Sequence, residues 1–132
     1  MYGAMIVLEP GRRWDPDRDR VVVFAVAGTA DTASVVAHRS DQPLKAGVPH
    51  RFRFVNIAAA DVVDVEALQD ERPISWRLVA KDGADLPMPR TQPARFSLGP
   101  GETMDVVVAP RPGSLILRVK SFNNFDAVFP VR

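Results

Sequence analysis

The amino-acid sequence predicts an all-β fold, a sandwich or barrel of short strands. Its apolar runs are short and rich in valine, which occurs nineteen times, with phenylalanine and isoleucine added. These are residues that strands favour. Most of the 12 prolines and 8 glycines fall between the runs, which suits the turns of a sandwich. Helical periodicity is hard to find, and its best stretch, residues 58–69, is interrupted by Val62, Val63 and Val65.

We expect nine strands, each a run of apolar or alternating residues bounded by turn residues. In chain order they are Ala4–Leu8, Arg20–Ala27, His50–Ile57, Val62–Leu68, Ser75–Ala80, Ala94–Leu98, Thr103–Ala109, Ser114–Lys120 and Ala127–Val131. Among the early strands, His50–Ile57 has the clearest pattern. Its two phenylalanines, Phe52 and Phe54, share one face, and Arg51 and Arg53 share the other. We therefore expect one face of this strand to be buried and the other to meet solvent.

Turn residues place the later strands. Asp82-Gly83 follows Ser75–Ala80 and is expected to reverse or bulge the chain. Pro100-Gly101 comes between the next two strands, where proline fixes φ and glycine takes a positive φ. Pro112-Gly113 has the same role before an apolar triplet, residues 115–117. That triplet is typical of a strand covered on both faces.

Composition and charge exclude several classes of protein. The chain has 132 residues, enough for one domain with a core of its own. Its net charge of +1 gives no electrostatic footprint for nucleic acid or an anionic membrane. The absence of cysteine excludes disulfides, thiolate nucleophiles and blue-copper centres. No run of residues is long enough for a transmembrane helix, and the sequence shows no secretory signal.

Three groups of residues are candidate metal ligands. Asp15, Asp17 and Asp19 have the spacing of a calcium loop, but the loop's glycine and final glutamate are replaced and four arginines compete for the carboxylates. We expect a solvated, self-neutralising turn there. His38 and His50 are expected to be surface or rim residues, because the chain lacks the Cys and His-x-His motifs of copper sites. The four scattered methionines, Met1, Met5, Met88 and Met104, are soft copper(I) ligands but are more typical of core filler.

Catalytic motifs are weak. No serine lies in a G-x-S-x-G context, and no phosphate-binding loop occurs. Asp82 with Asp85, or Asp64 with Glu66, are carboxylate pairs of the kind used in glycoside hydrolysis, but any chain with 16 acidic residues offers such pairs. The most individual stretch is Trp76–Pro87, an apolar strand followed by a polar loop. This loop is either an ordinary sandwich loop, with Lys81 paired to Asp85, or a loop that docks a neighbouring domain.

Four segments resemble, in order, parts of plastocyanin-like domains in multicopper oxidases. Lys45–Ile57 resembles their strand L-x-x-G-x-x-Y/H-R-x-R-hydrophobic-I/V-N, and Leu98–Val108 resembles their x-x-P-G-E-x-x-D-hydrophobic strand. Trp76–Pro87 is similar to the intervening strand and loop of a bacterial branch. Met1–Gly11 is similar to the strand that closes the preceding, copper-carrying domain.

This resemblance implies a cupredoxin-like Greek-key β-sandwich. The family oxidises substrates at a mononuclear copper and reduces oxygen at a trinuclear cluster, with ligands from His-x-His pairs and a His-Cys-His segment. None of these motifs occurs here, so no catalytic, cofactor-binding or metal-binding residue is carried over. Many such oxidases contain one copper-free domain as scaffold. We expect residues 12–132 to be such a domain and residues 1–11 to be the last strand of its neighbour, with copper-binding histidines just before Met1.

The functional alternatives stay open at this point. The leading hypothesis is a copper-free scaffold domain of a multicopper oxidase, inactive alone, whose partner is a copper-bearing domain. The second is a free-standing protein-binding module that uses the loop in Trp76–Pro87 or a sheet edge. The third is a small copper(I)-binding protein using His38, His50 and methionines. Self-association through Ala4–Leu8 is expected if that strand belongs to another domain. The family is mostly periplasmic or secreted, but localisation stays open.

Overall fold

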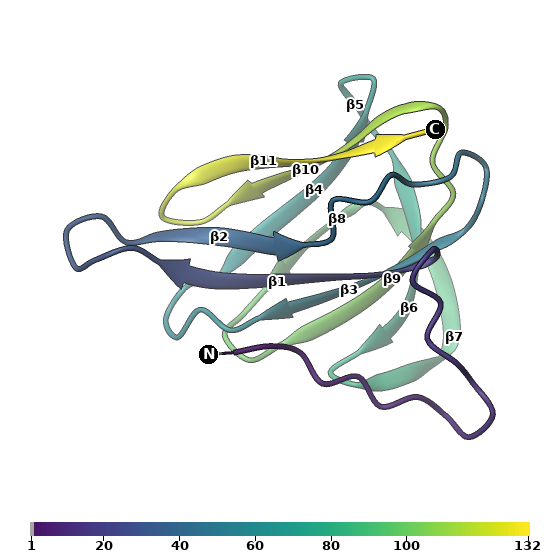
Figure 1. Cartoon of the computed structure of the whole chain (residues 1–132), viewed down its shortest axis with the longest axis horizontal. Helices are drawn as coiled ribbons and strands as arrows, with labels where there is room; N and C mark the ends of the chain where they lie inside the picture. The colour runs from purple at the N-terminus through teal and green to yellow at the C-terminus, as the bar shows by residue number, and fades with distance from the viewer. Residues whose placement is uncertain (1) are drawn as a thin grey trace.

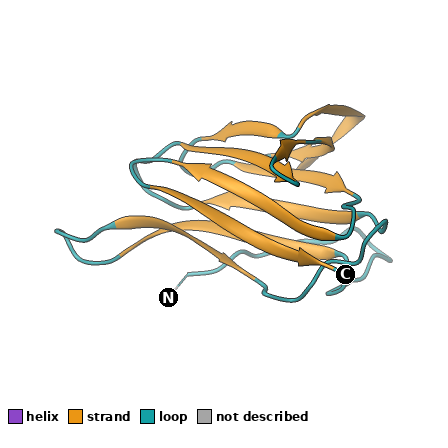
Figure 2. Cartoon of the chain, turned by 90° about the horizontal axis from the view of Figure 1, so that it is seen from above, coloured by secondary structure: helices purple, strands orange, loops and turns teal. Residues whose placement is uncertain are grey.

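The structure is a computed structural model that describes residues 2–132; Met1, one of the methionines considered above, lies outside the described residues. Two sheets form a sandwich, and the described residues include no helix (Figures 1 and 2). Sheet A has the order β2 (Ser34–Arg39), β1 (Asp19–Ala27), β3 (His50–Asn56), β9 (Thr103–Val108), β6 (Ser75–Lys81) and β7 (Ala84–Pro93). Sheet B has the order β11 (Asn124–Val131), β10 (Gly113–Lys120), β4 (Val63–Gln69) and β5 (Arg72–Pro73), and β8 (Arg95–Leu98) also pairs with β4. The predicted all-β sandwich is confirmed.

The chain crosses between the sheets several times, as in a Greek key. After β3 in sheet A the chain enters sheet B at β4, returns at β6, and later passes from β8 in sheet B to β9 in sheet A. β1 and β3 run parallel, whereas the other paired strands run antiparallel. β3 therefore lies in the interior of sheet A, between β1 and β9. Side chains on its outer face stand near the middle of that face.

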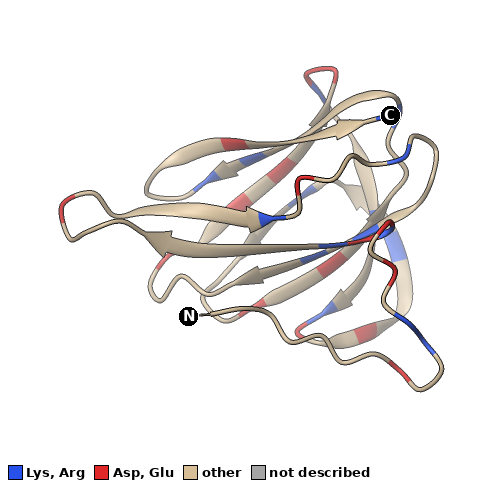
Figure 3. Ribbon diagram, in the orientation of Figure 1, with Lys and Arg blue, Asp and Glu red and all other residues tan. Residues whose placement is uncertain are grey.

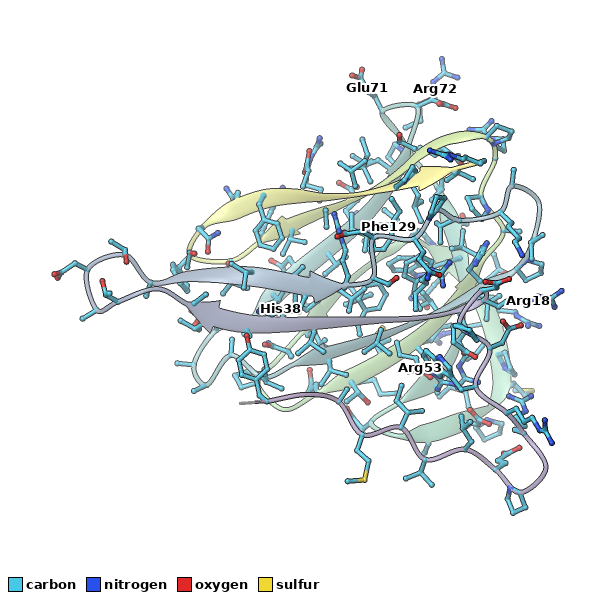
Figure 4. The ribbon with its side chains drawn as sticks, in the orientation of Figure 1. Arg18, His38, Arg53, Glu71, Arg72 and Phe129 are labelled. Atoms are coloured by element: carbon cyan, nitrogen blue, oxygen red, sulfur yellow. The ribbon has the colours of Figure 1, made fainter. Side chains whose placement is uncertain are left out.

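Aromatic side chains fill the space between the sheets. Phe52 and Phe54 point inward from β3 and are almost completely buried, as their alternation with arginine predicts. Phe52 meets Phe129 of sheet B edge to face, with 5.3 Å between ring centroids. Phe54 meets Phe96 of β8 at 5.0 Å, and Trp76 of β6 packs on both. Such pairs add to the hydrophobic stabilisation of burial. Phe129 is labelled in Figure 4.

Eight of the nine expected strands are present with small changes of boundary. The ninth, Ala4–Leu8, is wrong as a strand of this sandwich, because these residues form no ladder. Three strands were not predicted: β2, β5 and β7. β7 holds three prolines and pairs only with β6, and an edge strand tolerates proline because one row of its N–H groups needs no partner. In the described part of the chain no helix is long and apolar enough to cross a membrane.

Candidate interaction surface

The outer face of sheet A carries a cluster of ion pairs at its centre. Arg51 and Arg53 project from β3, and β9 places Asp105 directly opposite Arg53. Both guanidinium groups donate to the same oxygen, Asp105 Oδ2, with Arg51 Nε at 2.9 Å and Arg53 Nη1 at 2.6 Å. These short, charge-assisted hydrogen bonds are stronger than neutral ones. The arginine face predicted to meet solvent is therefore largely occupied by internal pairing.

Two further carboxylates complete the cluster. Arg51 Nη2 lies 3.1 Å from Asp85 Oδ1 of β7, and Arg53 Nη2 lies 3.4 Å from Asp19 Oδ1 of β1. The side chains of Arg51, Arg53, Asp105 and Asp19 are only 12–18% exposed. Three carboxylates and two guanidiniums leave one net negative charge. Figure 3 shows acidic and basic residues on neighbouring strands of this sheet, and Arg53 is labelled in Figure 4.

Residues 2–8, here called the N-terminal strap, lie over this face of the sheet. In Figure 1 the strap runs below β1 and β3 before the chain turns into β1. A cavity of about 390 Å³ lies between it and the sheet, lined by residues 4–8 on one side and by side chains such as Arg51, Arg53 and Asp105 on the other. Ile6 and Leu8 are half-buried, whereas Met5 and Val7 are 91% and 87% exposed. The strap thus presents apolar side chains to both sides.

Few contacts hold the strap in place. The Tyr2 hydroxyl lies 2.5 Å from His38 Nε2 on β2, and the two rings meet edge to face. Arg12 N–H donates to Glu9 O at 3.0 Å across a turn in which Gly11 has a φ of +84°. Within residues 2–132, no main-chain hydrogen bond joins the strap to a strand. The strap crosses the face of the sheet rather than an edge, so it meets side chains instead of free main-chain groups.

The two histidines lie in different environments. His38 is exposed on the outer face of β2, as predicted. The prediction that His50 is a surface or rim residue is wrong: it is fully buried, because it shares the inner face of β3 with Phe52 and Phe54. Its Nε2 accepts a hydrogen bond from Lys45 N–H at 3.0 Å. Burial lowers the pKa of His50 below its ordinary value.

The methionines considered as copper(I) ligands also lie in separate parts of the structure. Met5 lies on the strap, Met88 is 83% exposed on β7, and Met104 is buried in the core. Residues 2–132 contain no group of three or more His, Cys, Asp or Glu side chains arranged to hold a metal ion. With no cysteine, and with His38 and His50 on opposite faces of sheet A, the side chains do not fit a copper centre.

The acidic turn before β1 is held by partners within the protein. Asp15 Oδ1 accepts from Asp17 N–H at 2.9 Å, and Asp17 forms an ion pair with Lys45 at 2.7 Å. That hydrogen bond with Lys45 lowers the pKa of Asp17. Arg18, labelled in Figure 4, lies 3.7 Å from Asp15. The carboxylates of this turn thus have cationic and main-chain partners, which agrees with a self-neutralising turn.

Asp82 and Asp85, one of the two candidate carboxylate pairs, have separate partners. Asp82 accepts from Thr103 N–H at 3.0 Å, whereas Asp85 pairs with Arg51. Asp64 accepts from Ser97 Oγ at 2.5 Å on the outer face of sheet B. The loop in Trp76–Pro87 is the two-residue turn between β6 and β7, and Lys81 pairs with Asp82 and Glu102 instead of the predicted Asp85.

Sequence reasoning missed the ion cluster of sheet A. The alternation of arginine and phenylalanine placed Arg51 and Arg53 on the outer face, but nothing local identified their partner. Asp105 is more than fifty residues away in the chain, and only the pairing of β3 with β9 brings it to Arg53. A signal did exist in the sequence: Asp105 is the one charged residue within the otherwise mostly apolar run of residues 103–108.

Sequence comparisons find no match, whereas structural comparisons find solved proteins that share the fold. No family model matches the sequence, and no curated protein matches it. Lac15 from a marine microbial metagenome superposes with a TM-score of 0.70 at 18% identity, covering 92% of this chain and 35% of that one. Fet3p, a multicopper oxidase that functions in iron import, gives 0.68 at 9% identity, covering 93% and 29%. A copper-containing nitrite reductase from Thermus scotoductus SA-01 gives 0.70 at 14% identity, covering 96% and 35%.

These neighbours share the fold over nearly all of this chain, although their sequences are only 9–18% identical to it. The chain spans about a third of the length of each of them. The match covers one domain-sized part of larger copper proteins and agrees with the two-sheet topology described above. The chain is therefore a cupredoxin-fold β-sandwich of the kind found in multicopper oxidases.

Proposed function

We propose that this chain is a copper-free domain of a multicopper oxidase that serves as scaffold for a copper-bearing domain and is inactive alone. One observation carries the proposal: the cupredoxin sandwich extends over more than nine-tenths of the chain, yet its side chains do not fit a copper centre. In this proposal residues 12–132 form the scaffold sandwich. Residues 1–11 correspond to the closing strand of the neighbouring domain.

The strap supports this division of the chain. Its residues alternate as in a strand, but in this chain they have no strand to pair with. Its outward side chains, Met5 and Val7, are both almost fully exposed and lie on the same face of the strap, and neighbouring exposed apolar side chains of this kind mark interaction sites. A second domain packed on this side would cover both. The strap then acts as a layer between the two sandwiches.

The ion cluster supports a fixed orientation of such an interface. Its arginines and carboxylates are bound to each other across β1, β3, β9 and β7, so the outer face of sheet A is stiff. The strap, and through it a partner domain, therefore rests on a surface whose charges are already positioned. Positioned charges select the register of a contact more than they add to its affinity.

A copper titration of the purified chain tests this proposal. We expect no intense blue absorbance, no stoichiometric tight binding of copper(I) and no oxidase turnover. The matched variants His38→Gln and His50→Gln are expected to behave like the parent in all three measurements. A blue copper band would overturn the proposal, and so would tight copper(I) binding that vanishes in either variant.

A further inference from the structure

The chain between the strap and the sandwich contains a pair of adjacent arginines. Arg12-Arg13 is the only place in the sequence where two basic residues follow one another. Residues 9–14, here called the linker, are all exposed and form no strand. In Figure 1 the linker belongs to the purple bend at the lower right, between the strap and β1. It therefore presents two neighbouring positive charges to solvent.

The two guanidinium groups have almost no partners within the protein. Arg12 Nε lies 4.0 Å from Glu9 Oε2, and both side chains are more than 60% exposed, so water screens this long contact. Within residues 2–132, the Arg13 side chain forms no ion pair and no hydrogen bond. Both arginines are therefore available to a second molecule.

The main chain of the linker is also unpaired after Arg12. Arg12 N–H donates to Glu9 O, but within residues 2–132 neither Arg13 nor Trp14 has a main-chain hydrogen bond. A Cβ added to Gly11 would meet nothing within 4 Å, so the turn before the pair has open space around it. A bound peptide strand is held through its main-chain groups, which must be free to pair. The bond between Arg13 and Trp14 is accessible to a protease without prior unfolding.

We infer that this bond is a processing site for a serine protease that recognises paired arginines, and that its cleavage releases the strap. Trypsin-like enzymes hold a basic side chain in a pocket that contains a carboxylate. Adjacent side chains of an extended segment point to opposite sides, so Arg12 and Arg13 enter separate pockets. The bond between the Arg13 carbonyl carbon and the Trp14 nitrogen breaks. Water supplies the second oxygen of the new Arg13 carboxylate, and its two protons pass to Trp14, which leaves as an ammonium group.

The cut leaves the sandwich complete. The chain is fastened from Asp15 onward, because Asp15 O accepts from Asp19 N–H at 2.7 Å and Asp15 N–H donates to Asp19 Oδ2 at 3.1 Å. On the other side of the cut, the contacts of the strap are those of Tyr2 and of the half-buried Ile6 and Leu8. These contacts are too few to retain a separate peptide. If the strap carries a neighbouring domain, a consequence that rests on the proposed function, the same cut separates that domain from the sandwich.

Arg18 provides a matched control five residues further along the chain. Its side chain is 63% exposed, and it is labelled in Figure 4. Its main chain is nevertheless fixed, because its N–H donates to Asp15 O at 3.0 Å and its carbonyl accepts from Arg51 N–H at 2.8 Å. Both sites thus offer an exposed arginine, but they differ in whether the main chain is free. A difference in cleavage between them reports the free main chain.

Limited proteolysis of the purified chain, followed by mass spectrometry, is the first test. Trypsin is expected to cut first at the Arg12-Arg13 pair, more than about tenfold faster than at Arg18, because a cut at Arg18 requires local opening. A subtilisin-like protease specific for paired basic residues is expected to cut after Arg13 and to leave the sandwich intact. A first trypsin cut at Arg18 or within the strands would contradict the inference, as would resistance of the chain to the paired-basic protease.

Substitutions and separation of the products form the second test. We expect Arg12→Gln and Arg13→Gln each to abolish cleavage by the paired-basic protease, and Arg18→Gln to leave it unchanged. Size-exclusion chromatography of the cut chain should separate the peptide of residues 1–13 from a sandwich that still melts cooperatively. Unchanged cleavage of Arg13→Gln, or a peptide that stays bound to the sandwich, would overturn the inference. None of these readouts involves copper, so failure here is distinguishable from failure of the proposed function.

Discussion

The outer faces of sheets A and B carry the same kinds of charged residue in different surroundings. On sheet A, Arg51 and Arg53 share Asp105 in a cluster whose side chains are largely removed from water. On sheet B, Arg118 lies 3.3 Å from Asp126, and both side chains are more than 40% exposed. Burial makes removal of one partner costly on sheet A, whereas water screens the pair on sheet B. The difference indicates that the outer face of sheet A, and not that of sheet B, is a rigid surface.

The largest expected effect is from Asp105→Asn. This change leaves two partly buried guanidiniums without their shared carboxylate, so we expect the free energy of unfolding to fall by about 2–3 kcal/mol. Urea denaturation measures the loss. A loss below about 1 kcal/mol would show that Asp85 and Asp19 alone satisfy the arginines and that sheet A does not differ from sheet B.

A pH titration of stability compares buried and exposed positions within sheet A. Because burial lowers the pKa of His50, the unfolded chain takes up a proton at a pH where the folded chain does not. Stability is therefore complete well above the ordinary pKa of about 6.5 and falls as the pH drops through it. Urea melts between about pH 8 and pH 5.5 measure this fall.

The two histidines serve as controls for one another. We expect His38→Gln to keep the fall in stability, because His38 is exposed, and His50→Gln to remove most of it. The positive charges of Arg20 and Arg18 also lower the pKa of His50, so both oppose its protonation. If His38→Gln alone removed the fall, the assignment to the buried side chain would be wrong.

The two-residue turns of the sheets differ in one residue. In sheet A, Asp82 and Gly83 join β6 to β7 with φ values of 47° and 79°, whereas in sheet B, Asp70 and Glu71 join β4 to β5 with 52° and 59°. Turns with two positive φ values favour glycine. Glu71→Gly copies the sheet A turn, and we expect it to raise the free energy of unfolding by about 0.5–1 kcal/mol.

A neighbouring position controls for the general effect of glycine. Arg72 follows Glu71 at the tip of the same hairpin, and both are labelled in Figure 4. Arg72 lies in β5 without a positive φ, so Arg72→Gly is expected to reduce stability. Thermal melts of both variants measure the difference, and equal effects would contradict an explanation by backbone strain.

The smallest expected effect is from Asp126→Asn on sheet B. Its exposed pair with Arg118 contributes less than about 1 kcal/mol, and added salt screens that contribution further. Urea denaturation at low and high salt measures it. A loss as large as that of Asp105→Asn would remove the distinction between the two faces.

The sequence predicted the sandwich because its strands are local patterns. Arg51 to Phe54 alternate within one strand, and Asp82-Gly83 marks a turn without reference to the rest of the chain. β2 was missed because its second half, Ala37 to Arg39, carries polar residues on an edge strand. β7 was missed because its prolines are acceptable only at an edge, and the sequence does not show which strands lie at edges.

The candidate site was less predictable because it depends on pairing between distant strands. Asp105 becomes the partner of two arginines only through the register of β3 and β9. The sequence predicted His50 to be a rim residue because it precedes two arginines of the strand. It is buried because it lies on the same inward face of β3 as Phe52 and Phe54. For the strap, its apolar pattern is in the sequence, but its position across a sheet face is not.

The reading frame upstream of Met1 tests the central proposal most directly. If this chain is the copper-free scaffold of a copper oxidase, sequencing of the genomic DNA before the Met1 codon should reveal an open frame that encodes His-x-His pairs shortly before the strap. An in-frame stop directly before that codon would contradict the proposal. It would leave a free-standing cupredoxin sandwich whose partner must be sought at the strap.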